Sequence, residues 1–188
     1  MPEAGHSGMR DADMVTRAKD GDESAFESLV RQNADAVYGQ ALRFFGDPDS
    51  AQEAVQEVFV KVFRSLPSFK GDSAFSTWLF RVTRNVCLDM ARAGKRRPTP
   101  VDPLSMPEIA SGDFSDAVVA AQALETACSA LPPEERDAFN AVTLFGLSYE
   151  EAGEALGVPA GTVKSRVFRA RRALVTLLGL YAPGEGAR

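Results

Sequence analysis

The sequence predicts an all-α protein in which two small helical domains are joined by a flexible linker. Apolar residues recur at the i, i+3, i+4 and i+7 spacing of amphipathic helices through most of the 188 residues, and no alternating strand pattern is present. Residues 98–115 contain four prolines and lack a helical period, which is typical of a linker. The hydrophobic content of 45% is that of a folded chain.

The first domain is expected over residues 13–97, after a loose N-terminus at residues 1–12. A capping box from Ser24 to Glu27 should open a helix that Gly46 ends. Asp47 and Pro48 should start the next helix, since Asp is a good N-cap and Pro suits the first helical position. The apolar stripe of this second helix is predicted to comprise Ala51, Val55, Val58, Phe59, Val62 and Phe63, and Leu66-Pro67 should stop it.

A third helix of this domain follows a loop around Gly71. Ser73 is a suitable cap for it, and Gly94 should end it. Its buried stripe is predicted to comprise Phe75, Leu79, Val82, Val86 and Met90. A basic cluster, Lys95, Arg96 and Arg97, comes directly afterwards.

The second domain is expected over residues 116–180, before a tail at 181–188. Helices are predicted at residues 116–130 and again up to Gly146. A short helix then begins at a capping box, Ser148 to Glu151, and stops at Gly157. A tight turn leads to a basic helix, for which Thr162 is a suitable N-cap. A short helix, a tight turn and a basic helix together predict a helix-turn-helix.

Charge is distributed unevenly along the chain. The net charge is −5, yet residues 61–97 hold nine Lys and Arg against two Asp and Glu, and residues 161–188 hold six against one. The two segments that precede these basic blocks are acidic. This asymmetry indicates at least two kinds of partner surface, and the acidic total should keep the free chain from binding DNA strongly.

The basic helix has two faces on a helical wheel. Val163, Val167, Ala170, Leu174 and Leu177 cluster as the buried stripe. Ser165, Phe168, Arg169 and Arg172 fall on the opposite side, with Lys164 and Arg171 at the flank and Arg166 closer to the buried edge. Solvation alone does not call for an exposed Phe168 among arginines. A helix in the major groove uses cations for phosphates, small polar groups for base edges and an apolar group for a thymine methyl.

Several other classes of protein are disfavoured. The two cysteines, Cys87 and Cys128, are far apart, so no metal site or disulfide framework is expected. The one histidine, His6, lies in the N-terminal segment, and no nucleophile–base spacing occurs, so we expect neither an enzyme nor a cofactor. No run approaches a membrane span, and the start lacks the apolar core of a signal peptide, which predicts a cytoplasmic protein.

Three stretches resemble the sigma-70 family of RNA polymerase sigma factors, and within it the extracytoplasmic-function (group IV) subfamily. "LSYEEAGEALGVPAGTVKSRVFRARRAL" is similar to the region that reads the promoter −35 element. "DESAFESLVRQNADAVYGQALRFFGD" with "AQEAVQEVFVKVFRSL" resembles the region that docks on core RNA polymerase. "FKGDSAFSTWLFRVTRNVCLD" resembles the −10-reading region, and the resemblance covers residues 14–178.

The resemblance implies roles for particular residues. The polymerase-docking positions are Gln52, Glu53, Gln56, Glu57 and Lys61, whereas Phe59 fits the domain core better. The −10 positions are Phe69, Lys70, Gly71, Asp72, Ser73, Trp78, Arg81, Arg84, Asn85, Arg92, Lys95, Arg96 and Arg97. Phe69 and Asn85 match positions that help to capture a base flipped from the non-template strand, and the 70–76 loop matches the element that selects it. Trp78 could face melted DNA or pack between helices.

The −35 positions are Thr162, Lys164, Ser165, Arg166, Phe168, Arg169 and Arg172. Arg166 and Arg172 fit phosphate contacts, and Lys164, Ser165, Phe168 and Arg169 match positions that face the groove. The implied partners are core RNA polymerase, duplex −35 DNA, the melted −10 strand and an anti-sigma factor. The linker resembles the family segment that threads through polymerase, although a plain spacer would have the same composition.

The chain departs from the family pattern at two places. Gln52 and Glu53 stand where two acids are usual, and Ala152-Gly153 replaces an Ile-Ala pair, so the second domain is expected to be marginally stable because glycine weakens a helix. The alternative interpretation is a stand-alone helix-turn-helix regulator that binds duplex DNA as a dimer. The Phe, Trp and Asn content of the first basic block argues against it, because a dimerisation domain needs no surface for single strands.

Overall fold

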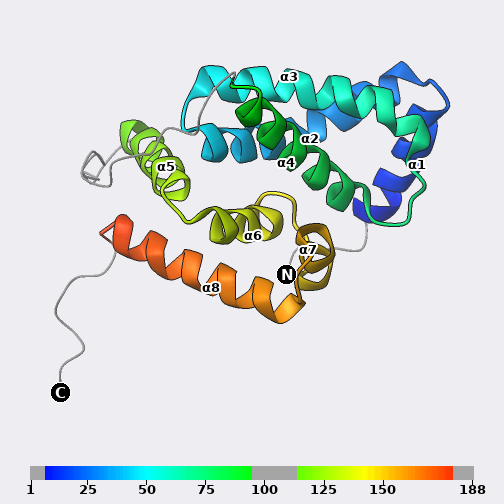
Figure 1. The fold of residues 1–188 in the computed structure, drawn as a ribbon. Coiled ribbons are helices and arrows are strands. Elements are labelled where there is room, and N and C mark those ends of the chain that lie inside the picture. Colours follow the sequence, from blue (N-terminus) through cyan, green and yellow to red (C-terminus); the bar gives the residue numbers. More distant parts are fainter. Residues whose placement is uncertain (1–6, 95–113, 180–188) are drawn as a thin grey trace.

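The computed structural model describes residues 7–94 and 114–179, and this part of the chain is all-helical, as predicted. Its elements are α1 (Ser7–Lys19), α2 (Glu23–Phe45), α3 (Pro48–Ser65), the 3-10 turn η1 (Leu66–Ser68), α4 (Phe75–Arg92), α5 (Phe114–Ser129), α6 (Pro133–Thr143), α7 (Tyr149–Leu156) and α8 (Ala160–Leu177). Figure 1 shows α1–α4 together on one side and α5–α8 on the other. The basic cluster Lys95–Arg97, linker residues 98–113 and the tail 181–188 lie outside the described residues.

The long antiparallel pair α2 and α3 frames the first domain. Asp47 caps α3 by accepting hydrogen bonds from the backbone N–H groups of Asp49 and Ser50, each 3.1 Å long, and Pro48 is the first helical residue, as predicted. Gly46 ends α2 in the left-handed conformation at φ 74°, which glycine adopts without strain. These two features turn the chain sharply, so that α3 packs back along α2.

Three expected helix starts differ from the structure. Helix α2 begins at Glu23, and its cap is Asp22 rather than Ser24, because the Asp22 carboxylate accepts from the Ala25 N–H at 3.1 Å. Helix α4 begins after Ala74, which makes no side-chain cap, so Ser73 is not the cap. Helix α8 begins at Ala160 after Pro159, so Thr162 lies inside its first turn. Helices α2 and α8 therefore begin earlier than their expected caps, whereas α4 begins one residue later than a cap at Ser73 would place it.

Helix α1 begins at Ser7, within the segment expected to be a loose N-terminus. Its C-terminal half is held by a small apolar cluster in which Val15 packs with Leu29 and Leu66. Lys19, at the end of α1, donates a hydrogen bond from Nζ to the carbonyl oxygen of Phe69, 2.6 Å away. Helix α1 is therefore joined both to the core and to the loop that precedes α4.

The helix-turn-helix forms as predicted. The Ser148 hydroxyl and the Glu151 carboxylate make a reciprocal capping box at the start of α7, and Gly157 ends α7 at φ 70°. Gly153 lies where α7 approaches the turn: a Cβ placed there would be 2.7 Å from the carbonyl oxygen of Val158. The glycine that the sequence marks as a weakness is thus required for the close approach of α7 to the following turn.

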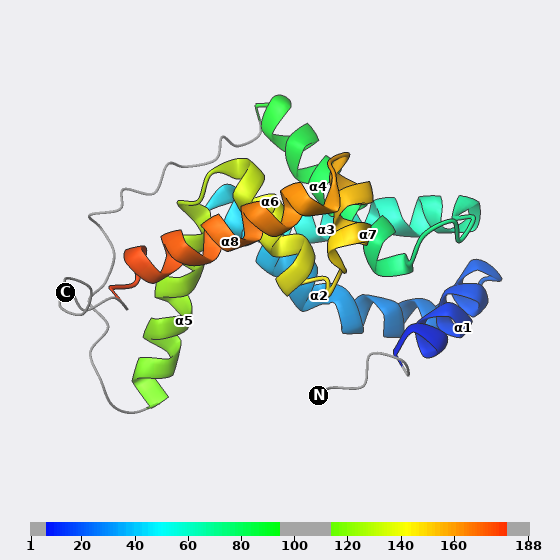
Figure 2. The same cartoon turned by 90° about the horizontal axis from the view of Figure 1, so that it is seen from below.

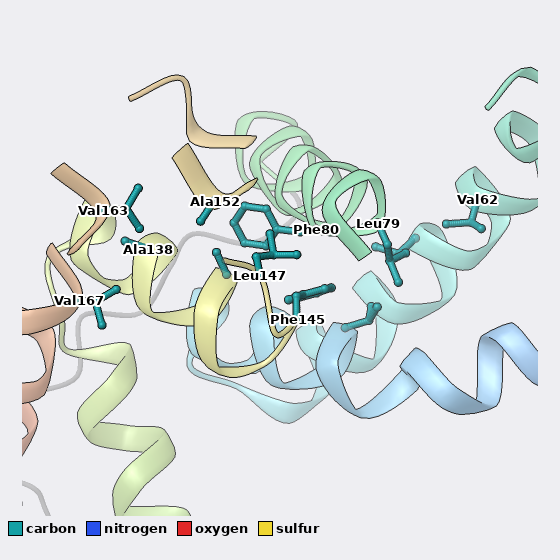
Figure 3. Close-up of a cluster of buried hydrophobic side chains, with 12 residues drawn as sticks. Val62, Leu79, Phe80, Ala138, Phe145, Leu147, Ala152, Val163 and Val167 are labelled. Carbon is teal, nitrogen blue, oxygen red and sulfur yellow. The ribbon is translucent and has the colours of Figure 1, made fainter. Parts of the chain in front are cut away.

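The two domains pack directly against one another. Phe80 of α4 meets Phe145 edge to face, with ring centroids 5.4 Å apart. Figure 3 shows Phe80 beside Leu147 and Ala152, and these residues belong to one buried cluster that continues to Val163 of the recognition helix. Figure 2 shows the same closeness of α4 and α7 from below. The hydrophobic core therefore runs from one domain into the other.

The packing of the two domains explains why residues outside the predicted apolar stripe of α4 are also buried. Leu79 and Met90 are buried as expected, but Phe80, Thr83 and Cys87 are buried as well. The last three share a face with Arg84, at the i, i+3, i+4 and i+7 spacing of a helix. Because Phe80 packs on Phe145 and Arg84 pairs with Asp137, this second face is the one toward the other domain.

A buried ion pair reinforces the contact. Arg43 of α2 is 5% exposed and donates to both carboxylate oxygens of Glu125 in α5, at 2.8 and 2.9 Å. Its remaining donor group reaches Asn140 Oδ1 at 2.9 Å. Burial opposes its charge, yet the hydrogen bonds and charge of Glu125 leave the pKa of Arg43 raised. A second arginine reaches across the interface from the other domain: Arg136 of α6 lies over the ring of Phe44 of α2, 5.5 Å from its centroid.

Candidate nucleic-acid and polymerase interfaces

The recognition helix α8 presents the two faces that the wheel predicts. Val163, Val167, Ala170 and Leu174 are buried, and Leu177 is half-buried. Phe168 is 61% exposed although it is a large aromatic residue, and the Arg172 guanidinium lies 6.0 Å from its ring centroid. Lys164, Ser165, Phe168, Arg169 and Arg172 together form an exposed face that carries cations, a hydroxyl and an aromatic ring. This is the composition that a major groove can accommodate.

Two arginines of α8 are engaged by the acidic first turn of α6. Arg169 Nε donates to Glu135 at 2.7 Å, and its side chain is still 55% exposed. Arg166 pairs with Glu134, and its side chain is only 15% exposed, in keeping with its place at the buried edge. Thr162 is half-buried, and its carbonyl oxygen accepts from the Ser165 hydroxyl at 2.9 Å. DNA contact by Arg169 would therefore compete with an existing carboxylate.

In the first domain, three aromatic residues at and beside the loop formed by residues 69–74 cluster together. Phe69 lies 5.1 Å from Trp78 and 6.2 Å from Phe75 between ring centroids. Trp78 is half-buried between them and contributes to the small apolar cluster under α1, so its packing role is substantial. Lys70, Gly71 and Asp72 are exposed at the tip of the loop, Ser73 is half-buried, and Gly71 has a φ of 80°.

Asn85 does not join this cluster. It is exposed on α4, nine residues beyond Ser76, which corresponds to about 13 Å along the helix axis. Arg81 and Arg84 are half-buried, and Arg92 is exposed. Within the described residues, the predicted −10 positions from Phe69 to Arg92 are thus spread along one loop and one helix, over a length that suits several nucleotides better than a single base.

Arg84 is already partnered across the domain interface. Its Nε donates to Asp137 of α6 at 2.7 Å, and the Asp137 side chain is 13% exposed. Three predicted DNA-contacting arginines, Arg84, Arg166 and Arg169, therefore each pair with a carboxylate of α6 in this arrangement. Release of Arg84 for DNA requires the two domains to part or Asp137 to exchange its partner.

The predicted polymerase-docking residues all lie on the outer side of α3. Gln52, Gln56, Glu57 and Lys61 are exposed, and Glu53 is half-buried. Phe59 is half-buried against the shared core, as favoured from the sequence. A shallow groove of about 280 Å³ runs beside this face, with Glu57 and Lys61 on one side and residues of α4 on the other.

Two apolar residues of α3 are exposed that the sequence did not single out as surface. Phe63, expected in the buried stripe, is 63% exposed, with its ring 5.2 Å from that of Phe26. Val60 is 45% exposed. The exposure of Val60 could have been predicted from the sequence, because Val60 lies on the same helix face as the polar residues Gln56 and Arg64, four positions from each. Exposed large apolar groups beside polar ones are typical of a protein-binding surface.

Other kinds of site are not apparent in the described part of the chain. Within residues 7–94 and 114–179, no group of three His, Cys, Asp or Glu side chains could hold a metal ion. None of the described helices is both long and apolar enough to cross a membrane. Burial raises the pKa of the Cys87 thiol to about 12 and that of Cys128 to about 11, so both thiols are protonated at neutral pH.

Comparison with known proteins identifies two family regions in the chain. Residues 29–97 match sigma-70 region 2, and residues 121–174 match sigma-70 region 4. The chain is 35% identical over 178 residues to the ECF RNA polymerase sigma-E factor of Escherichia coli K12, covering 88% of this chain and 93% of that one. It is 35% identical over 179 residues to the RNA polymerase sigma-H factor of Pseudomonas aeruginosa, with coverage of 88% and 92%.

A further relative is longer, and two solved structures are similar. The ECF RNA polymerase sigma factor SigE of Mycolicibacterium smegmatis is 39% identical over 171 residues, which are 86% of this chain and 66% of that protein. The fold is similar to that of CnrH in complex with the cytosolic domain of CnrY, with a TM-score of 0.68, 26% identity and coverage of 92% and 99%. It is also similar to the sigma factor RpoE bound to the anti-sigma factor NepR from Bartonella quintana, with a TM-score of 0.62, 26% identity and coverage of 84% and 98%.

The exposed recognition helix, the aromatic loop beside basic α4 and the polar face of α3 thus occur in a chain that matches sigma-70 regions 2 and 4 in that order. The chain belongs to the sigma-70 family, and within it to the extracytoplasmic-function (ECF) subfamily of RNA polymerase sigma factors.

Proposed function

We propose that this protein binds core RNA polymerase and directs it to promoters by contacting the −10 and −35 elements and by helping to melt the start site. The observation that carries this proposal is that one chain presents two surfaces of different chemistry, each suited to a different form of nucleic acid. One is an exposed helix-turn-helix face suited to duplex DNA, and the other is an aromatic and basic surface suited to a single strand. A regulator that bound only duplex DNA would have no use for the second surface.

The domain boundaries proposed are residues 13–97 for region 2, 98–115 for the linker and 116–180 for region 4. Docking on core polymerase is assigned to Gln52, Glu53, Gln56, Glu57 and Lys61. The exposed apolar Val60 and Phe63 extend the proposed docking surface along α3, because such a surface needs an apolar centre with a polar rim.

DNA contacts are assigned to the positions that the family resemblance implies, some of which are exposed and others half-buried in the closed arrangement. On region 4 these are Thr162, Lys164, Ser165, Arg166, Phe168, Arg169 and Arg172, of which Arg166 is the least accessible. On region 2 they are Phe69–Ser73, Trp78, Arg81, Arg84, Asn85, Arg92 and, beyond the described residues, Lys95–Arg97. Replacing Arg169 with alanine should reduce discrimination at one −35 base pair by about 1–3 kcal/mol if it reads a base. An equal loss across all promoter sequences would assign it to phosphate instead.

The two promoter elements are too far apart for the closed arrangement of domains to reach both. Elements centred near −35 and −10 are separated by about 25 base pairs, or roughly 85 Å. A compact chain of this length has a radius of gyration of about 16 Å. The contact of Phe80 with Phe145 and the ion pair of Arg84 with Asp137 must therefore break in the initiating complex. The closed arrangement is assigned to the free protein.

Fluorescence energy transfer tests this assignment. Dyes attached through cysteines introduced at Gln32 of α2 and Thr176 of α8, both exposed, report the separation of the two domains. The native thiols are buried and resist labelling. Transfer should be efficient in the free protein and should fall when core polymerase is added. Equal transfer in both states would contradict the proposed opening.

An anti-sigma factor is the proposed regulatory partner. Support comes from the two similar solved structures, CnrH with the cytosolic domain of CnrY and RpoE with the anti-sigma factor NepR. A partner that held regions 2 and 4 together would keep the docking and DNA surfaces from acting at once. Because polymerase and DNA are the proposed partners, the proposed location is the cytoplasm and the proposed role is non-enzymatic.

Run-off transcription tests the proposed function. Core polymerase alone and core polymerase with this protein are compared on fragmented genomic DNA. New transcripts that require the protein support the proposal. Binding of a palindromic duplex by the protein alone, without new transcripts, would support the dimeric regulator instead.

A further inference from the structure

An open pocket of about 440 Å³ lies between α1 and the loop that leads into α4. One wall is formed by the loop, with Phe69, Lys70, Gly71 and Ser73, and by the first two residues of α4, Phe75 and Ser76. The opposite wall is formed by Ala12, Val15, Thr16 and Lys19 of α1, which share one helix face at the i, i+3, i+4 and i+7 spacing. The pocket thus combines the expected base-selecting loop with a helix that the sequence did not implicate.

The chemistry of the walls suits a single unstacked base. Phe69 and Phe75 supply aromatic surface, and Ser73 and Ser76 supply hydroxyl groups that can donate or accept hydrogen bonds. The Thr16 hydroxyl donates to the Ala12 carbonyl oxygen at 2.9 Å, so it can offer a base only its acceptor lone pairs. A splayed base is recognised by this combination of an aromatic surface with polar groups at its edge. Asn85 is not among the residues that line the pocket, so base selection here depends on other groups.

Lys19 has a particular place in this pocket. Its Nζ donates to the Phe69 carbonyl oxygen at 2.6 Å, across fifty residues of sequence, so it ties the end of α1 to the first residue of the loop. An ammonium group has three N–H donors and no acceptor, and this bond uses one of them. The remaining donors favour a base edge that presents oxygen or ring-nitrogen acceptors, and they disfavour an edge that presents an amino group.

We propose that α1 forms half of the pocket for the flipped −10 base and that Lys19 is a specificity-determining residue, which fixes the loop and donates to the base edge. The inference rests on the proposed function, since it requires a melted −10 strand. Its occupant is one unpaired nucleotide of the non-template strand, whose phosphates the exposed Lys70 attracts.

The test uses holoenzyme reconstituted from core polymerase and the full chain, with fork-junction promoters that carry each of the four bases, or an abasic site, at each unpaired −10 position. Lys19→Met should reduce the preference for the favoured base at one position by about tenfold, the size expected for one charge-assisted hydrogen bond. At the abasic position, Lys19→Met and wild type should bind equally. Lys19→Arg, which keeps charge and donors, should retain most of the preference.

Two further variants serve as controls. The first tests whether the pocket is occupied without altering stability, and the second tests whether loss of a positive charge elsewhere has the same effect. Ala12→Phe, at an exposed helical position that lines the pocket, should block the same base position while leaving the melting temperature unchanged. Arg31→Gln removes a positive charge from an exposed pair on α2 and should change nothing. An unchanged −10 preference in Lys19→Met holoenzyme, or a loss equal for all bases and for the abasic site, would overturn the inference while leaving promoter-directed initiation intact. Failure of wild-type holoenzyme to initiate would instead refute the proposed function.

Discussion

Replacement of Arg43 by methionine should weaken the joint between the two domains. The guanidinium is buried and makes three hydrogen bonds, two to Glu125 and one to Asn140. Loss of one partner from a buried ion pair costs about 3–5 kcal/mol, because the other charge is left without compensation. The Glu125 side chain is 28% exposed and can regain water, which favours the lower end, about 3 kcal/mol.

Urea denaturation followed by circular dichroism measures this effect as a change in the free energy of unfolding. Arg31→Met is the matched control, because Arg31 pairs with Glu27 on the surface, where both side chains are at least 70% exposed. Such a pair contributes only about 0.3–0.5 kcal/mol. Adding Glu125→Gln to Arg43→Met should recover part of the loss, since the unpaired carboxylate is then gone. A loss below about 1 kcal/mol for Arg43→Met would refute the assignment of this ion pair as a buried interdomain joint.

Three other predictions concern single positions. Gly153→Ala should destabilise the protein by about 1–2 kcal/mol in the same urea assay, because the added Cβ would crowd the Val158 carbonyl oxygen. The cost of this crowding exceeds the gain in helix propensity from glycine to alanine, and a gain in stability would contradict the prediction. Cys87 and Cys128 should react with a thiol reagent at pH 8 only after denaturation, since burial holds their pKa values near 12 and 11; rapid reaction of either in the native protein would count against its burial. Hydrogen bonds hold the pKa of Asp22 at about 2, below its ordinary value of 3.8, so its stabilising contribution is complete above about pH 4 and is lost toward pH 2. The difference in melting temperature between wild type and Asp22→Asn should therefore shrink over that window, and a difference independent of pH would refute the shift.

The recognition helix could be predicted in detail because the 3.6-residue periodicity of a helix alone decides which of its residues are buried. Val163 and Val167 are buried and Phe168 and Arg169 are exposed, as the helical wheel requires. The capping box at Ser148 and the stop at Gly157 are equally local, since they depend on hydrogen bonds and backbone angles within a few residues. Features of this kind are encoded in short stretches and need no knowledge of the rest of the fold.

Helix starts were less predictable where two caps compete. Asp22 and Ser24 are both good N-cap residues, and the choice between them depends on which side chain reaches the free backbone N–H groups. In the structure, the Ser24 hydroxyl donates to the Asp22 carboxylate and Arg17 pairs with it, so Asp22 is held as the cap. The contact with Arg17 depends on where α1 ends, and no helix was predicted before Ser24.

The contacts between the domains could not be predicted from periodicity. Phe80 and Cys87 lie on a face of α4 separate from the predicted stripe, and only the position of the second domain decides that this face is buried. Likewise, Phe63 fits an apolar stripe by spacing but remains exposed at the edge of α3. The pairing of Arg84 with Asp137 joins residues 53 positions apart, which no local pattern encodes.

Mapping of transcription start sites in a purified system tests the central claim most directly. Core polymerase with this protein should initiate at a set of sites that core polymerase alone ignores, and the DNA upstream of those sites should share two sequence elements near −10 and −35. The −35 element should weaken in Arg169→Ala holoenzyme, while the −10 element should persist. Absence of new start sites, or start sites without shared upstream elements, would contradict the assignment of this chain as a promoter-specificity subunit.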